Sequence, residues 1–369
     1  MSLNSWIDLS IGSVDYPIDP LIKRHAAAKL LGSWPGYGDR YGLTELRQHI
    51  ARWINTRLQT HFTSDNVLIT AGASMGLQTL YQCYRPKLVL IPNPGFPLYR
   101  QALDRLGIDW TYYRVDDWNA CEADIVAGLA KADAIIVNSP GNPIGHVVPP
   151  YLIEKVTAIC ASRHLLMISD EVYCEFIWNT SREFLKALPP FFAFFNANPN
   201  RGVYVGSFSK MFGLSAFRVG FIIHNDLKQL EHLAATYWQI GMSVNWLGPH
   251  VAALCMSNDD SRPVTIRNMI RTNYDHAQTL FEKFHVPYIP VQSGIFVCVD
   301  ISSMELSSDV VAARLAESEH VLVSPGTQFG NGGQSLVRLN LAVPQEILQD
   351  GLIRFGKFFE KGSASVCAR

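Results

Sequence analysis

Residues 207–220 read Ser-Phe-Ser-Lys-Met-Phe-Gly-Leu-Ser-Ala-Phe-Arg-Val-Gly and run into the apolar stretch Val219–Ile223, which has the composition of a buried strand. Lys210 lies here among small hydroxyl residues. A lysine in such a setting can lose its solvation, which lowers the pKa of the amine and makes it a nucleophile towards carbonyl carbons. Ser207 and Arg218 offer a hydroxyl group and a guanidinium group suited to a phosphate. The stretch indicates a reactive lysine beside an anion site, although taken alone it also fits a solvated lysine on a loop.

A carboxylate follows an earlier apolar run. Asp170, in the string Asp-Glu-Val-Tyr, comes directly after Leu165–Ser169. If that run is a strand of a doubly wound sheet, Asp170 lies at the carboxyl edge, where ligands bind. An acid there can keep a pyridine nitrogen protonated, and an amine, a phosphate anchor and such an acid are what pyridoxal phosphate needs. The alternative is that Asp170 caps a helix.

Three further motifs follow apolar runs. Ser139–Gly145 forms a loop rich in proline and glycine in which Asn142 can donate a hydrogen bond to a phenolate. The small residues of Ala71–Gly76 allow backbone amides to reach an anion at a helix N-terminus. In the string Pro94–Tyr99, Phe96 can stack on a flat ring. Each motif alone also fits a turn, an ordinary strand–helix connection or a core aromatic.

The order of apolar and helical segments predicts an α/β fold. Most of the apolar runs are separated by segments with helical periodicity, as in Tyr151–Arg163, and the pattern of Glu45–Gln59 predicts an amphipathic helix ahead of the first run. Alternation of this kind favours a largely parallel sheet with helices on both faces. The predicted strands are Val67–Thr70, Leu88–Ile91, Trp110–Val115, Ala134–Val137, Leu165–Ser169, Val203–Gly206 and Val219–Ile223.

A second, smaller α/β unit is expected after this sheet. Residues 227–283 are predicted to be mostly helical, with breaks at Gly248-Pro249 and Arg262-Pro263. The tail then alternates between strands and helices, and Gly330–Gly333 reads as a turn. We expect a large domain at residues 35–245 and a small domain formed by residues 1–34 and 246–369. The tail elements are Ile295–Val299, Val310–Glu317, Val321–Val323, Leu336–Leu341 and Gln345–Phe359.

The composition is that of an ordinary globular protein. A chain of 369 residues implies about two domains, and a net charge of −1 provides no basic field for nucleic acid or acidic membranes. No apolar run reaches the roughly 18 residues of a membrane span, and the first residues lack a leader pattern. The 7 cysteines form no C-x-x-C pair, which favours reduced thiols over a disulfide framework or a metal site. We therefore expect a cytoplasmic protein.

Taken together, the motifs resemble those of the class I and II aminotransferases, which are fold-type I pyridoxal-phosphate enzymes. The matching strings are SPGNPIG at 139–145, SDEVY at 169–173, SFSK at 207–210 with Arg218, and VRLNLA at 337–342. The resemblance covers nearly the whole chain. It implies a mostly parallel seven-stranded sheet in a large domain, with a smaller α/β domain beside it.

The resemblance also implies residue roles. Lys210 would form the Schiff base, Asp170 would pair with the pyridine nitrogen, and Tyr173 and Asn142 would contact the ring oxygen. Tyr37 would reach the phosphate of the neighbouring subunit, so that a homodimer shares its two sites. The implied cofactor site is Tyr37, Ala73, Ser74, Phe96, Asn142, Asp170, Tyr173, Ser207, Lys210 and Arg218. The implied catalytic residues are Lys210, Asp170 and Tyr173, and the implied substrate contacts are Arg338, Asn142 and Gly12.

The implied activity is transamination between an amino acid and a 2-oxo acid by a ping-pong mechanism. Related chemistry on the same cofactor stays open: β-elimination by a C–S lyase, decarboxylation, or a cyclising synthase. The effector-sensing half of a transcription regulator is disfavoured, because the helix at 45–59 starts too soon for a DNA-binding extension and Lys210, Asp170 and Arg338 are all present. Ile144, Ala216 and Phe96 depart modestly from the family pattern. Side-chain specificity is expected to depend on residues 11–18, Tyr37 and residues 243–246.

Overall fold

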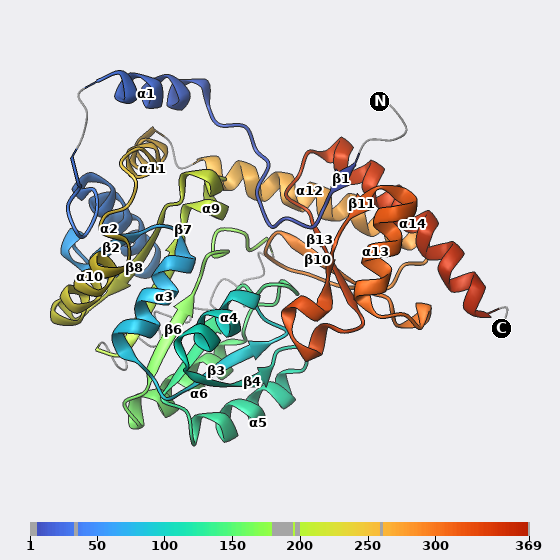
Figure 1. Cartoon of the computed structure of the whole chain (residues 1–369), viewed down its shortest axis with the longest axis horizontal. Helices are drawn as coiled ribbons and strands as arrows, with labels where there is room; N and C mark the ends of the chain where they lie inside the picture. Colours follow the sequence, from blue (N-terminus) through green and yellow to red (C-terminus); the bar gives the residue numbers. More distant parts are fainter. Residues whose placement is uncertain (1–5, 33–35, 179–194, 196–199, 259–260, 368–369) are drawn as a thin grey trace.

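The structure is a computed structural model, and it describes residues 6–32, 36–178, 195, 200–258 and 261–367. In Figure 1 a large sheet lies beside a group of smaller sheets, and the long helix α12 (Ser261–Lys283) extends from the first part to the second. The first described strand, β1 (Ile7–Asp8), lies beside β11 (Val321–Leu322) of the smaller sheets. The candidate active site lies where the two parts meet.

The larger sheet has the strand order β2-β8-β7-β6-β5-β3-β4. Neighbours from β7 to β4 run parallel, whereas β8 is antiparallel to both β7 and β2. The prediction of a mostly parallel seven-stranded sheet is confirmed, and each strand lies within two residues of its expected bounds. The strands are β2 (Val67–Thr70), β3 (Leu88–Asn93), β4 (Asp109–Arg114), β5 (Ala134–Asn138), β6 (Leu166–Asp170), β7 (Gly202–Ser207) and β8 (Gly220–His224).

Helices cover both faces of this sheet. Alternate residues of a strand point to opposite faces, so Ile135 and Met167 pack in one buried cluster with α5 and α6, whereas Ile136 and Ile168 pack in another with α3, α4 and α10. Burial on both faces explains why these strands read as continuous apolar runs. The surrounding helices are α2 (Thr44–Leu58), α3 (Ala73–Tyr84), α4 (Pro97–Leu106), α5 (Trp118–Leu129), α6 (Pro150–Ser162) and α10 (Leu227–Gly241).

The two predicted helix breaks after residue 227 are misplaced. Helix α11 (Leu247–Asn258) contains Gly248-Pro249 in its first turn, and α12 contains Arg262-Pro263 in the same place. The N–H groups of the first turn have no acceptor within the helix, so a proline there costs no hydrogen bond. A proline can therefore mark the beginning of a helix as well as its end. The prolines therefore mark helix beginnings, and the break after α10 lies ahead of Gly248.

The smaller sheets contain the expected strands of the tail. The antiparallel sheet has the order β12-β13-β10-β9, and β1 (Ile7–Asp8) pairs in parallel with β11 (Val321–Leu322). The two-residue strands β1, β9 and β12 were not predicted, because so short a segment has no periodicity to detect. The remaining elements are α1 (Pro20–Leu31), α9 (Phe208–Met211), β9 (Tyr288–Ile289), β10 (Phe296–Asp300), α13 (Ser308–Glu319), β12 (Ser324–Pro325), β13 (Leu336–Asn340) and α14 (Gln345–Cys367).

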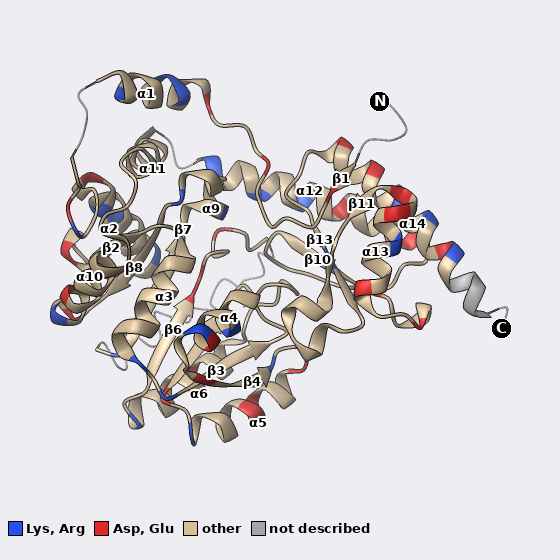
Figure 2. Cartoon of the chain, viewed as in Figure 1, with Lys and Arg blue, Asp and Glu red and all other residues tan. Residues whose placement is uncertain are grey.

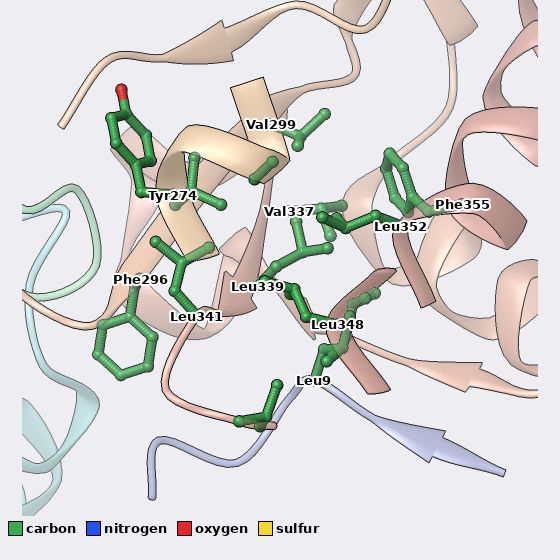
Figure 3. Packing of buried hydrophobic residues seen from close by; sticks show 14 of the residues in the cluster. Leu9, Tyr274, Phe296, Val299, Val337, Leu339, Leu341, Leu348, Leu352 and Phe355 are labelled. Atoms are coloured by element: carbon green, nitrogen blue, oxygen red, sulfur yellow. The ribbon is translucent and has the colours of Figure 1, made fainter. Parts of the chain in front are cut away.

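The N-terminal segment completes the core of the smaller sheets. Figure 3 shows Leu9 next to Leu348 of α14, with Leu339 of β13 in the same cluster, and all three side chains are fully buried. The expected joining of the N-terminal segment to the C-terminal unit is consistent with this packing. The domain limits at 34/35 and 245/246 stay a prediction, and residues 33–35 lie outside the described part of the chain.

Charged residues of both signs are interspersed along the outer helices, including α10 and α14 (Figure 2). This distribution agrees with the net charge of −1. Among the described residues, none of the helices has both the length and the apolar character needed to cross a membrane.

Candidate active site

Four parallel strands direct their carboxyl ends to one edge of the larger sheet. Asn138 ends β5, Asp170 ends β6 and Ser207 ends β7, while α3 begins soon after the end of β2. Because β2 and β7 are each antiparallel to β8, they run in the same direction as each other. The residues that follow the apolar runs therefore meet at the edge where α/β sheets bind ligands.

A cavity of about 250 Å³ lies at this edge. With the exception of Tyr37, each site residue expected from the sequence lines it. These are Gly12, Ala73, Ser74, Phe96, Asn142, Asp170, Tyr173, Ser207, Lys210, Arg218 and Arg338. Gly12 comes from the N-terminal segment and Arg338 from β13, so the smaller sheets close one side of the cavity.

Lys210 is held on the short helix α9. This helix is capped by the Ser207 hydroxyl, which accepts a hydrogen bond from the amide of Ser209 at 3.1 Å. The Lys210 amine donates to the carbonyl of Gly12 and lies 6.0 Å from the centre of the Tyr173 ring. Burial, together with the positive charges of Arg338 and Arg218, lowers the pKa of Lys210 to about 8, against the opposing attraction of Asp170. A substantial fraction of the amine is therefore neutral near physiological pH.

Asp170 is 3% exposed and is hydrogen bonded at both oxygens. Its Oδ2 accepts from the hydroxyl of Tyr99 at 2.6 Å, and its Oδ1 accepts from the amide of Val172 at 3.3 Å. Burial raises the pKa of Asp170 to about 6, while these two hydrogen bonds and the Lys210 charge hold it down. A turn rather than a helix follows the strand, so Asp170 is not a helix cap.

The opposite part of the cavity is suited to an anion. Ala73 and Ser74 open α3, whose cap, Gly72, contributes no side-chain hydrogen bond to the first amides. Arg218 lies against Gly72, where a β-carbon would come within 2.4 Å of the guanidinium Nη2. A helix N-terminus, a guanidinium and the neighbouring hydroxyl of Ser207 together form an arrangement that binds phosphate groups.

Arg338 closes the side formed by the smaller sheets. Its Nη1 donates to Oδ1 of Asn142 at 3.0 Å, and its Nη2 donates to the carbonyl of Ser10 at 2.7 Å and to the hydroxyl of Ser324 at 3.0 Å. Its Nε is buried and has no hydrogen-bond partner among the described residues. Burial lowers the pKa of Arg338 to about 10. An arginine with one unpaired N–H is suited to receive a carboxylate at its edge.

The remaining cavity residues are aromatic or amide side chains. The Phe96 ring lies 5.6 Å from that of Tyr99, in an edge-to-face arrangement. Tyr173 is 4% exposed and lies 6.0 Å from Phe296, and burial raises the pKa of its hydroxyl. Because Oδ1 of Asn142 accepts from Arg338, the amide nitrogen of Asn142 stays available as a donor.

Tyr37 is not brought to this cavity by its own chain. Its side chain is 76% exposed, and its ring lies 6.5 Å from Trp238 of α10. It lines a separate hollow of about 670 Å³ together with Ser243–Trp246. Tyr37 and residues 243–246 therefore lie away from this chain's own cavity, and the roles expected of them stay predictions.

Tyr99 and Asn138 are site residues that sequence reasoning did not select. Asn138 ends β5, and its side-chain amide donates to the carbonyl of Asp170 at 3.0 Å while its Oδ1 accepts from the amide of Asn142 at 2.9 Å. A signal for each was present, because Asn138 directly follows an apolar run and Tyr99 ends the string that contains Phe96. Both residues orient their neighbours in the cavity.

Comparison with known families identifies the class of this protein. Residues 4–354 match the model of the family "Aminotransferase class I and II". The chain therefore belongs to the class I and II aminotransferases, which confirms the resemblance, and it is an enzyme of the transaminase class.

Individual relatives agree with this assignment. The chain is 24% identical to an aspartate aminotransferase of Sulfolobus acidocaldarius, over 96% of this chain and 90% of the relative. It is 26% identical to the putative aminotransferase YugH of Bacillus subtilis, over 98% of this chain and 93% of the relative. The crystal structure of an aromatic aminotransferase from Pyrococcus horikoshii superposes with a TM-score of 0.86 at 23% identity, covering 96% of each chain. At that identity the superposition supports the fold.

Tyr99 is expected to keep the pKa of Asp170 down. In the Tyr99→Phe variant the carboxylate loses its shortest hydrogen bond, so the pKa of Asp170 should rise above about 6. Infrared titration of the carboxyl band, assigned by its loss in Asp170→Asn, measures this shift. Tyr113→Phe is the matched control, because this buried hydroxyl donates to the carbonyl of Ile136 instead. An unchanged titration of Asp170 in Tyr99→Phe would contradict the argument.

Proposed function

We propose that the protein is a pyridoxal-phosphate-dependent aminotransferase that moves an amino group between an amino acid and a 2-oxo acid by a ping-pong mechanism. The observation that carries the proposal is a single cavity that contains a buried lysine, a buried carboxylate and two arginines: Lys210, Asp170, Arg218 and Arg338. The cofactor, when bound, supplies an electron sink for the bonding electrons of the substrate α-carbon.

The free thiols of the described cysteines favour a cytoplasmic location.

The residues of the cavity fit this cofactor. Its phosphate would be held by the first amides of α3, at Ala73 and Ser74, together with the hydroxyl of Ser207 and the guanidinium of Arg218. The close approach of Arg218 to Gly72 supports this role, because any side chain at position 72 would displace the guanidinium. Phe96 offers an aromatic face for the ring.

Lys210 would act first as nucleophile and then as base. Its pKa of about 8 leaves the amine partly neutral, so Lys210 would be the residue that holds the aldehyde group of the cofactor covalently. When it is not so bound, its neutral amine would take a proton from the α-carbon of the substrate and hold that proton at Nζ. Tyr173, within 6.0 Å of the amine, would help to fix its position.

Asp170 would keep a proton on the ring nitrogen of the cofactor. Burial disfavours the ionised form of this carboxyl group and raises its pKa to about 6. A cation next to Asp170, such as a protonated ring nitrogen, would stabilise the ionised form. The hydrogen bond from Tyr99 and the short turn to Val172 fix the orientation of both oxygens. Fixed charge placed where charge develops in the reaction is the main source of rate enhancement expected here.

Arg338 would bind the α-carboxylate of the substrate. The Nε atom lacks a hydrogen-bond partner among the described residues, so its N–H can donate a hydrogen bond to a carboxylate at the edge of the guanidinium. Asn142, already hydrogen bonded to Arg338, would orient it and direct its own amide nitrogen to the ring oxygen of the cofactor. Gly12 leaves room at the wall beside Lys210, since a β-carbon there would meet Phe296 at 2.7 Å.

The partner expected for this chain is a second copy of itself. Tyr37 is exposed and remote from its own cavity, which is what a residue donated to a neighbouring site requires. Each site of the homodimer would then combine Lys210 of one subunit with Tyr37 of the other.

Lys210→Ala should abolish covalent attachment of the cofactor. Borohydride treatment of the wild-type protein should add the cofactor mass to the peptide containing Lys210, and the variant should lose this adduct and turn over slower by orders of magnitude. Attachment to the wild-type apoprotein should accelerate roughly tenfold per pH unit and level off above about pH 8, where the amine is neutral. Lys228→Ala, an exposed lysine of α10, is the control. Near-normal turnover by Lys210→Ala would refute the mechanism.

Asp170→Asn should retain the cofactor but slow the chemical step. The amide keeps the shape of the carboxylate and loses its charge, so single-turnover deamination should fall by ~10³-fold. Stopped-flow absorbance with a saturating amino acid measures the step. Glu171→Gln removes a carboxylate one residue away that is buried and does not line the cavity, and it should react at the wild-type rate. Equal rates for Asp170→Asn and the wild type would exclude the proposed role.

Tyr37→Phe should weaken cofactor binding, by about 1 kcal/mol for one lost hydrogen bond and by more if the acceptor is charged. Mixing Tyr37→Phe subunits with Lys210→Ala subunits tests the shared site, because each heterodimer contains one site with neither substitution. Tight binding should reappear in that fraction of sites. Mixing Tyr37→Phe with the double variant Tyr37→Phe/Lys210→Ala restores none and serves as the control. A fully active monomer in sedimentation would contradict the model of shared sites.

A further inference from the structure

A second hollow of about 400 Å³ opens on the far side of Arg338. It shares Gly12, Phe96 and Arg338 with the candidate active site, so the two spaces adjoin at the residue proposed to hold the substrate carboxylate. Its remaining wall contains Ile11, Pro97, Val323 and Phe329. The α-carbon of an amino acid carries both the carboxylate and the side chain, so a side chain directed past Gly12 and Phe96 would enter this hollow.

The guanidinium of Arg338 lies between two phenyl rings. Its Cζ is 3.9 Å from the centre of the Phe296 ring and 4.6 Å from that of Phe329. Phe296 lines the active-site cavity, whereas Phe329 lines the hollow. Because two rings lie against the guanidinium, the directions from which a carboxylate can approach it are restricted, and with them the orientation of the rest of the bound molecule.

The polar side chains of the hollow are mostly hydrogen bonded within the protein. The hydroxyl of Ser10 donates to Oδ1 of Asp8 at 2.6 Å. The hydroxyl of Ser324 donates to the carbonyl of Ser10 at 2.9 Å and accepts from Arg338. Gln328 is the other polar side chain in the wall, and it is exposed at the mouth. Polar and apolar groups therefore line the hollow in about equal measure, and most of the polar groups already have a partner within the protein.

The described residues that line the two spaces include three cations. Lys210 and Arg218 have proposed roles towards the cofactor, and Arg338 has one towards the α-carboxylate. Within this described lining, no further lysine or arginine is left to pair with a second carboxylate. A distal carboxylate placed against this wall would lose part of its hydration without gaining a cationic partner from the same subunit, which is unfavourable.

We propose that this hollow binds the side chain of the amino donor and selects large, uncharged, apolar amino acids over aspartate and glutamate. The inference rests on the proposed aminotransferase function and names its substrate class. Ile11, Val323 and Phe329 form the apolar contacts, and the lack of a further cation in the described lining provides the discrimination.

The first test is the half-reaction of the holoenzyme with single amino donors. The half-reaction is followed by the change in absorbance of the cofactor. Its kcat/KM with leucine or phenylalanine should be at least roughly 10-fold higher than with aspartate or glutamate, which is the range expected from apolar contacts and an unpaired carboxylate. Using one donor without an oxo-acid acceptor removes the second substrate from the comparison. Equal or faster reaction with aspartate or glutamate would overturn the proposal.

The second test measures binding without turnover. The holoenzyme should bind 4-methylpentanoate more tightly than succinate in calorimetry. Ile11→Asp should weaken 4-methylpentanoate binding by roughly 10-fold, and Gln328→Arg should strengthen succinate binding by supplying a cation. Ile11 is 61% exposed, so its replacement leaves the core intact, and Leu227→Asp on α10, at 53% exposed, is the matched control that should change neither affinity.

The two tests separate the two proposals. If no donor reacts but 4-methylpentanoate still binds more tightly than succinate, and Ile11→Asp reduces that preference, transamination is wrong and the assignment of the hollow stands. If donors react and succinate binds as tightly as 4-methylpentanoate, transamination stands and the assignment of the hollow is wrong. An unchanged affinity in both Ile11→Asp and Leu227→Asp would likewise exclude the hollow as the side-chain site.

Discussion

Burial of an amine and a carboxylate in one cavity is the constraint on which the site depends. The low polarity of the surroundings lowers the pKa of Lys210 to about 8 and raises that of Asp170 to about 6, while the attraction between the two charges opposes both shifts. The amine becomes available because Arg338 and Arg218 add their repulsion to the effect of burial. The arginines proposed to bind the two anionic groups therefore also keep the lysine reactive.

The larger sheet provides the rigidity that this balance requires. Its central strands are buried on both faces, and their polar residues are concentrated at one edge, where Asn138, Asp170 and Ser207 end neighbouring strands. Close packing of β5, β6 and β7 fixes the spacing between these residues, and the hydrogen bonds of Asn138 to Asp170 and Asn142 fix their loops. Small changes in the distance between amine and carboxylate would alter both pKa values.

Much of this arrangement could be predicted from the sequence because it depends on local order. Lys210 and Asp170 each follow an apolar run closely, and parallel strands must end at a common edge. Arg338 and Gly12 were placed only by family resemblance, since they come from elements remote in sequence whose contact depends on tertiary packing. Tyr99 was missed because its contact with Asp170 depends on the rotational phase of α4, which the composition of one turn does not reveal.

Arg338 is buried at a cost in folding stability that favours the binding of a carboxylate. Its guanidinium is buried between two phenyl rings, and its hydrogen-bond partners are the neutral groups of Asn142, Ser10 and Ser324. A buried cation with neutral partners and an unpaired Nε is destabilising by itself. These contacts come from the loop after β5, the N-terminal segment and β12, so three separate parts of the chain hold the cation in place. Its unfavourable burial is relieved when a carboxylate binds, and this difference is available as binding free energy.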